Sequence, residues 1–281
     1  MKRTTTLLAA AAVAISVAGM ARAAGNTGLT KVAGFDHQVT GVSVAPDGRT
    51  FVNFPRWTDD APISVAEVLP GGKLRPYPDA KWNSWRNAKQ NEMPVGDYFV
   101  CVQSVVADGR GLDGHPSTQV EKDVVVKVDG RPLRRPDGRQ PAFSADGIAL
   151  SNDGATLYWQ ALTGRTLYSI ATNKLTKGVA ANDVAAAVQT VGTTTVADGL
   201  WMSKAGALYV TSPMDNSVKR WNGKTLETVV SDPRLRWPDT MSEGPDGTIY
   251  VTASHIQDTS WFKPGAPASL PTALFSFKPG R

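Results

Sequence analysis

Short stretches of alternating apolar and polar residues recur along this chain, and turns that contain glycine separate them. Successive side chains of a β-strand point to opposite faces, so this period of two predicts strands, and a glycine turn between two strands predicts a hairpin. Each first strand begins with a small or acidic residue. The hairpins cover residues 40–54, 146–160, 198–211 and 239–252, with a further one that begins at Gln103 and turns at 108–109.

Weaker strand pairs follow some of the hairpins, among them residues 64–69 with 74–77 and 217–221 with 227–230. The nearest candidate for an amphipathic helix, residues 179–188, is short. Two hairpins per unit, repeated about every 40 to 50 residues, are typical of the four-stranded blades of a β-propeller. We therefore predict an all-β fold with residues 24–281 as a single propeller domain; an irregular all-β sandwich is the alternative.

A propeller would bring together acidic residues that lie far apart in the sequence. The first strand of each blade lines the central channel, so the side chains at its start meet at one mouth. We expect Asp146, Asp198 and Asp239 to converge there as the catalytic candidates. Neighbouring hairpins and loops would supply a ligand-binding rim, for which the candidates are Arg56, Trp57, Gln103, Gln160, Asn216 and His255.

The N-terminus predicts export. Lys2 and Arg3 precede an apolar run at residues 7–17 and a small-x-small sequence at 21–23, which is the pattern of a cleaved signal peptide over residues 1–23. The apolar run is shorter than the roughly 20 residues that span a bilayer. We therefore expect a secreted or periplasmic protein without stable membrane insertion after cleavage.

Charge and cysteine content narrow the possible partners. The 281 residues carry a net charge of +5, which falls to +2 once the three basic residues of the signal peptide are removed. So small a surplus provides little attraction for nucleic acid, and the basic cluster at 131–139 fits a solvated hairpin. The single cysteine excludes an internal disulfide. We expect a monomer that takes a small-molecule ligand and no nucleic acid.

Several separated motifs carry a family resemblance. They are residues 99–105, 145–151 leading to 157–159, 163–169, 198–200 leading to 208–210, and 236–239. Together they resemble the Yellow/major royal jelly protein family. The resemblance implies a secreted six-bladed propeller. Insect members of that family include enzymes that convert dopachrome, alongside binding and nutritional proteins, so a dopachrome tautomerase-like isomerase is one expectation.

The chain departs from the family pattern after Gly111. The turn at 108–109 should lead into an apolar strand, but residues 112–118 form a polar turn instead. By repeat length about a blade and a half is missing, as in an internal deletion. We therefore expect an incomplete propeller of about four to five blades: either a shortened ring that closes with fewer blades, or an open ring whose gap would expose strand edges.

The three aspartates suit two kinds of chemistry. A cluster of like charges raises the pKa of at least one carboxyl, as a general base for proton abstraction requires. Clustered oxygens also suit Ca²⁺, and Asp146 and Asp198 resemble two metal ligands of the gluconolactonase/regucalcin-type lactonases. Residues 40–42, however, lack that family's early ligand. Alternatively, each aspartate only accepts hydrogen bonds from backbone N–H groups where its strand begins.

Three functions therefore stay open at the level of the sequence. The first is a secreted Yellow-like propeller that binds, and as an enzyme isomerises, a small aromatic molecule at the channel mouth. The second is a Ca²⁺-dependent lactonase that uses Asp146 and Asp198 as ligands. The third is a non-catalytic binding or structural protein, which the missing segment favours.

Overall fold

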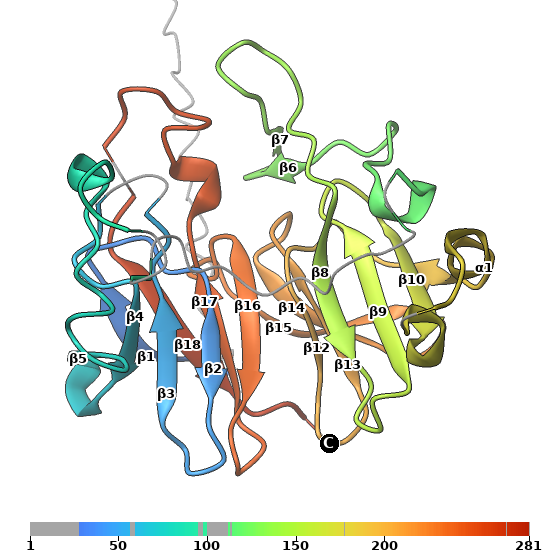
Figure 1. The fold of residues 1–281 in the computed structure, drawn as a ribbon, viewed down its shortest axis with the longest axis horizontal. Coiled ribbons are helices and arrows are strands. Elements are labelled where there is room, and N and C mark those ends of the chain that lie inside the picture. Colours follow the sequence, from blue (N-terminus) through green and yellow to red (C-terminus); the bar gives the residue numbers. More distant parts are fainter. Residues whose placement is uncertain are drawn as a thin grey trace, which may run out of the picture.

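A computed structural model describes residues 28–56, 60–94, 98–99, 112, 114–176, 178–267 and 269–280 of this chain. The described residues form four antiparallel sheets of four strands each, which stand side by side with their strands roughly upright in Figure 1. Listed from the innermost strand outward, the sheets are β2 (Val42–Val44), β3 (Thr50–Asn53), β4 (Val65–Val68) and β5 (Leu74–Pro76); β8 (Ala145–Leu150), β9 (Thr156–Ala161), β10 (Thr166–Ala171) and β11 (Gln189–Thr193); β12 (Leu200–Met202), β13 (Leu208–Ser212), β14 (Ser217–Trp221) and β15 (Leu226–Ser231); and β16 (Pro238–Glu243), β17 (Ile249–Ala253), β18 (Thr272–Phe277) and β1 (Thr30–Phe35).

The predicted hairpins form with the expected register. Val42 lies opposite Val52 in the first sheet, and Leu200 lies opposite Val210 in the third. Gly154 and Gly247 in two of the turns have φ angles of +71° and +76°, which glycine adopts without strain. The fifth predicted hairpin, beginning at Gln103, lies outside the described residues.

Helices contribute little to the fold. The described residues contain one short α-helix, α1 (Ala181–Ala186), inside the predicted segment 179–188. None of their helices has both the length and the apolar character needed to cross a bilayer. The remaining helical turns are 3₁₀ turns: η1 (Pro70–Gly72), η2 (Asn87–Lys89), η4 (Pro116–Thr118), η5 (Thr172–Leu175) and η6 (Ile256–Asp258).

The innermost strands of neighbouring sheets pack against one another: β2 against β16, β16 against β12, and β12 against β8. The approach is closest beside the aspartates. A Cβ atom on Gly147 would lie 2.7 Å from the carbonyl oxygen of Asp198, and one on Gly199 would lie 2.0 Å from that of Asp239. Because only glycine permits such contacts, the two glycines set the spacing of the inner strands.

Apolar side chains fill the space between neighbouring sheets. Between the third and fourth sheets lies a buried cluster that includes Tyr209, Met241 and Phe275, and between the fourth and first sheets a second one includes Val52 and Leu274. Burial of these facing surfaces stabilises the radial arrangement. The chain is therefore an all-β propeller, as its sequence predicts.

The inner strands of the described residues do not form a closed ring. Among the described residues, β8 and β2 do not pack against each other as the other neighbouring inner strands do. Between β5 and β8 the described residues pair only in the short hairpin of β6 (Lys127–Val128) with β7 (Arg131–Pro132). The described residues thus form four four-stranded blades, and the neighbours that do not pack together, β8 and β2, lie on either side of the place where the sequence departs from the repeat.

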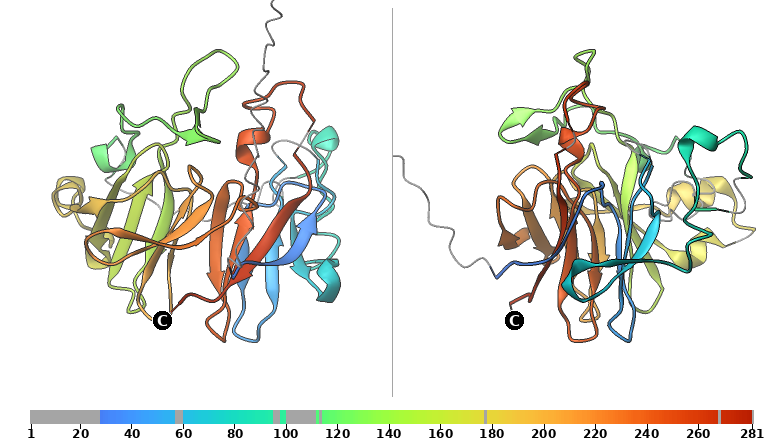
Figure 2. Two further views of the ribbon diagram at one scale, coloured as in Figure 1. Left: turned by 180° about the vertical axis from the view of Figure 1, so that it is seen from behind. Right: turned by 90° about the vertical axis from the view of Figure 1, so that its left-hand side faces the viewer.

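The strand nearest the N-terminus completes the last sheet, which the sequence did not predict. β1 pairs antiparallel with β18, with Thr30 opposite Ser276 and Phe35 opposite Thr272. Figure 2 shows this blue strand beside the red strands of the C-terminal sheet. Because β16, β17 and β18 alone would leave a three-stranded sheet, the two ends of the described chain close one blade together.

We predict that Gly199→Ala destabilises the fold by about 3 kcal/mol, because the new methyl group would overlap the backbone of Asp239. The measurement is urea unfolding followed by circular dichroism. Gly280→Ala is the control, since nothing lies within 4 Å of a Cβ atom built there. Equal unfolding midpoints for Gly199→Ala and the wild type would show that the inner strands are not in close contact.

Candidate active site

A cavity of about 480 Å³ lies where the inner strands of the four sheets meet. Each of the four sheets contributes the beginning of its innermost strand, and segments outside the sheets supply apolar side chains. The lining consists of residues 40–42, 146–148, 198–201 and 239–241 together with Phe143, Leu162, Trp237, Ile256 and Trp261. The three predicted aspartates thus meet in one cavity; that they are catalytic stays a prediction.

Local irregularities of the inner strands direct the aspartates into this cavity. The pairing of β8 with β9 shifts between Ala145 and Ile148, and that of β16 with β17 shifts between Pro238 and Met241. Asp146 and Asp239 lie within these two shifts. A β-bulge re-aims a side chain in this way, and bulges are common next to active sites.

Threonine hydroxyls accept hydrogen bonds from the backbone N–H groups at these strand starts. Thr211 Oγ1 accepts from the N–H groups of Asp198 and Gly199 at 3.2 and 2.8 Å, and Thr252 Oγ1 accepts from that of Thr240 at 3.1 Å. The alternative in which each aspartate caps its own strand start therefore finds no support at these two strands.

The environments of the three carboxyl groups differ. Asp198 Oδ2 accepts a 2.5 Å hydrogen bond from the indole Nε1–H of Trp237. Asp239, which is 8% exposed, accepts a 3.0 Å hydrogen bond from the hydroxyl of Thr240. Among the described residues no side chain or backbone group hydrogen-bonds the carboxylate of Asp146, which lines the cavity. Asp146 is therefore the carboxylate most available to a ligand.

The pKa values of all three carboxyls are raised, chiefly by burial. The pKa of Asp146 rises to about 6 and that of Asp239 to about 7, and the pKa of Asp198 rises well above its ordinary value. The negative charge of Asp146 adds to the effect of burial at both Asp198 and Asp239. Near neutral pH the cluster therefore holds negative charge and protons at the same time.

The walls around the carboxyls are apolar and aromatic. Trp237 is 1% exposed and packs with Val126, Leu162 and Ile256 in one hydrophobic cluster. Of the described residues that line the cavity, none is lysine, arginine or histidine. The cavity thus combines aromatic surface with negative charge. The sequence did not predict Trp237 as a site residue, although residues 236–239 are one of the motifs that carry the family resemblance.

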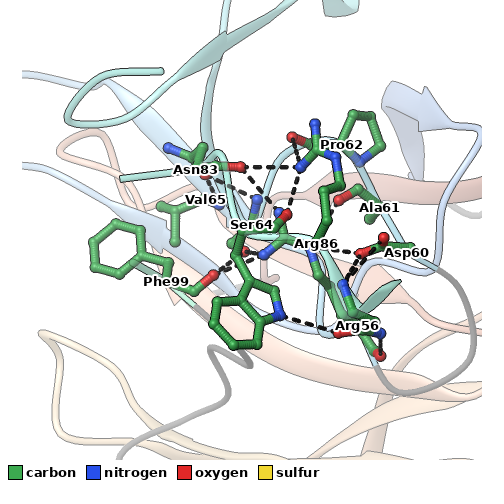
Figure 3. A network of polar contacts seen from close by, with 11 residues as sticks. Arg56, Asp60, Ala61, Pro62, Ser64, Val65, Asn83, Arg86 and Phe99 are labelled. Atoms are coloured by element: carbon green, nitrogen blue, oxygen red, sulfur yellow. Dashed lines mark hydrogen bonds and ion pairs between the residues drawn. The ribbon is translucent and has the colours of Figure 1, made fainter. Parts of the chain in front are cut away.

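Arg56 lies outside the cavity lining, although the sequence placed it at the rim. Its guanidinium donates hydrogen bonds to the carbonyl oxygens of Ala61 at 2.8 Å, Phe99 at 2.7 Å and Asn83 at 3.0 Å, as Figure 3 shows. It also forms a 3.5 Å ion pair with Asp60. The side chain thus ties together the backbone at Ala61, Asn83 and Phe99, and ligand contact through it stays a prediction.

The other rim candidates that the structure describes, Gln160, Asn216 and His255, do not line the cavity either. Gln160 is fully buried and donates to the carbonyl oxygen of Thr195 at 2.9 Å, and Asn216 occupies the turn between β13 and β14 with φ of +50°. His255 Nδ1 lies 2.9 Å from the carbonyl oxygen of Ser269 and faces a separate pocket of about 110 Å³. Ligand contact through these residues stays a prediction. Trp57 and Gln103 lie outside the described residues.

The residues of the cavity do not fit a bound metal. Within the ranges that the structure describes, no group of three or more His, Cys, Asp or Glu side chains has an arrangement that could hold an ion. The Ca²⁺-dependent lactonase alternative therefore lacks support from the geometry.

Solved structures with some likeness to this chain include several enzymes. A luciferin-regenerating enzyme is 12% identical over 89% of this chain and 94% of its own, with a TM-score of 0.49. A putative glucose dehydrogenase from Thermus thermophilus is 12% identical over 89% and 99%, with a TM-score of 0.45. A gluconolactonase from Xanthomonas campestris is 17% identical over 57% and 58%, with a TM-score of 0.35. Likeness at this level carries no information about activity.

Comparison of the sequence with family models is more specific than these structural likenesses. No curated protein matches the sequence significantly. The family model described as major royal jelly protein matches residues 115–260, just over half of the chain, and this stretch contains Asp146, Asp198, Trp237 and Asp239. The chain therefore belongs to the major royal jelly protein family.

Proposed function

We propose that this protein is an exported propeller that binds a small aromatic molecule in the central cavity and isomerises it by proton transfer. The observation that carries the proposal is the convergence of Asp146, Asp198 and Asp239, with raised pKa values, in one aromatic-walled cavity. Perturbed carboxyls in a cavity are typical of sites for acid–base catalysis. Export rests on the signal-peptide pattern of residues 1–23.

The charge of the lining selects the ligand class. A ligand that carries a carboxylate would face three carboxyl groups, and no basic side chain lines the described wall to offset the repulsion. A neutral or cationic aromatic molecule avoids this cost, and the lining includes Trp201 and Trp261, residues whose rings attract cations. The volume of about 480 Å³ suits a molecule of one or two fused rings.

The cluster supplies both a base and an acid. In its ionised form Asp146 removes a proton from a ring carbon of the ligand, and the electron pair moves through the conjugated system to a carbonyl oxygen. That oxygen takes a proton from Asp239, which is protonated below about pH 7. The ligand is isomerised without gain or loss of electrons, and the proton now on Asp146 returns to Asp239 through the cluster or solvent. Dopachrome-type iminoquinones undergo this class of reaction.

Asp146→Asn should lower kcat about 10²- to 10⁴-fold with an aminochrome substrate, because the amide cannot accept the ring proton. The assay follows aminochrome decay by absorbance. Asp123→Asn, at an exposed carboxyl outside the cavity, is the matched control and should match the wild type. Equal rates for Asp146→Asn and the wild type would leave the cavity as a binding site only.

The substrate preference follows from the charge of the cavity. We expect kcat/KM for the decarboxylated analogue of dopachrome to exceed that for dopachrome at least about tenfold, which corresponds to about 1.4 kcal/mol. The comparison uses both substrates at one pH and ionic strength. Faster turnover of dopachrome would show that a cation outside the described lining neutralises its carboxylate.

The pH profile of kcat/KM should be bell-shaped. Activity rises as Asp146 ionises at about pH 6, and it falls as Asp239 loses its proton at about pH 7, so the maximum lies between these values. Steady-state rates from pH 4.5 to 9 test this expectation. A profile that keeps rising above pH 8 would contradict the assignment of a carboxyl as the acid.

The raised pKa of Asp239 also lowers the free energy of unfolding at high pH. Above the ordinary value of 3.8 the unfolded chain releases the Asp239 proton, whereas the folded chain retains it up to about pH 7. The free energy of unfolding therefore falls as pH rises through this interval. Asp239→Asn should be more stable than the wild type at pH 8, by at most about 4 kcal/mol, and the difference should vanish near pH 4. Urea unfolding at both pH values measures it, and a difference that is independent of pH would contradict the raised pKa.

A further inference from the structure

One hydrogen bond joins two blades at the wall of the cavity. Trp237 precedes β16, and its indole Nε1–H donates to Oδ2 of Asp198, which precedes β12, at 2.5 Å. Because Trp237 is 1% exposed and packs among Val126, Val128 and Leu162, its ring cannot swing out to water. Within the described residues the second oxygen of Asp198, Oδ1, makes no hydrogen bond, so it faces only the repulsion from Asp146 and Asp239.

The backbone of Trp237 is held in an unfavourable conformation. Its φ of +53° lies in the left-handed region, which bulky residues rarely adopt and which costs about 1–3 kcal/mol. The carbonyl oxygen of Trp237 accepts hydrogen bonds from the backbone N–H and the hydroxyl of Ser254 at 3.1 and 3.2 Å. Pro238, the next residue, further disfavours the ordinary helical conformation. Such strain persists only where neighbours impose it, often at a functional site.

Arg236 fixes the residue before this tryptophan from two sides. Its guanidinium donates to both carboxylate oxygens of Asp129, in the turn between β6 and β7, at 3.1 and 3.2 Å. It also donates to Asp258 Oδ2, in η6, at 2.9 Å. The carbonyl oxygen of Arg236 accepts the backbone N–H of His255 at 3.3 Å. Arg236 thus ties a hairpin and a 3₁₀ turn above the cavity to the segment that carries Trp237.

We propose that Trp237 is a positioning residue that holds Asp198 in the orientation needed for proton exchange, and that Arg236 maintains Trp237 in place. The hydrogen bond commits Oδ2 of Asp198 to the wall and leaves Oδ1 as the oxygen that exchanges protons with Asp146 or Asp239. This role rests on the proposed isomerase function. The contact itself, however, can be detected in the ligand-free protein without any turnover.

The first test is the ¹H–¹⁵N spectrum of the indole N–H groups in ligand-free protein, with Trp237→Phe used for assignment. We expect the Trp237 signal to lie downfield and to exchange slowly, and to move upfield in Asp198→Ala because the carboxyl acceptor of its hydrogen bond is lost. Trp159 is the internal control. It is also buried, but its indole donates to the carbonyl oxygen of Ser117 at 3.0 Å, so its signal should not move.

The second test is kinetic. Trp237→Phe should lower kcat about 10- to 100-fold and change KM less than kcat, as expected for a residue that orients a catalytic group. Trp159→Phe removes an indole of similar burial that neither lines the cavity nor bonds a carboxyl group, and it should leave kcat unchanged. Arg236→Gln, which keeps Trp237, should show a smaller loss of kcat and an upfield shift of the same indole signal. Arg236→Gln also tests the positioning role if Trp237→Phe does not fold.

The outcomes separate this inference from the proposed function. If the Trp237 signal depends on Asp198 but no aminochrome is turned over, the proposed isomerase function is wrong, while the hydrogen bond between Trp237 and Asp198 is confirmed. Turnover with an indole signal that Asp198→Ala does not move would overturn the positioning role. Trp237→Phe kinetics equal to those of Trp159→Phe would overturn it as well.

Discussion

The contact on which the rest of the structure depends is the close approach of neighbouring inner strands at Gly147 and Gly199. In both places the glycine follows an aspartate and meets the backbone of the next aspartate around the ring. The contact that packs one blade on the next therefore also brings carboxyls from three sheets to one cavity. Burial and mutual repulsion then raise their pKa values, which opposes folding, and the apolar clusters between the sheets offset this cost.

Much of the fold could be predicted because its signals are local. Alternation with a period of two and a glycine turn specify a hairpin within about 15 residues, so the strands form close to their predicted bounds. The meeting of Asp146, Asp198 and Asp239 could be predicted for the same reason. Each begins an equivalent inner strand, and a radial repeat brings equivalent positions together.

The remaining features depend on partners that are distant in sequence. The hairpin geometry placed Arg56 near the rim, but the carbonyl oxygens of Ala61, Asn83 and Phe99 accept hydrogen bonds from its guanidinium. Trp237 became part of the site through a contact with Asp198 that no spacing rule anticipates. The pairing of β1 with β18 is equally invisible in the sequence, because β1 has no hairpin partner next to it. Long-range pairing of this kind needs the tertiary structure.

The pairing of β1 with β18 has a consequence for how the molecule reaches its native state. Contacts between positions as distant as 30 and 276 give the topology a high contact order, and loop closure over such a separation is slow. A chain emerging from the ribosome cannot complete its last blade until both ends of the sheet are available. Until then β1, which is synthesised first, has no partner strand, and an unpaired strand is the kind of surface through which incompletely folded chains associate.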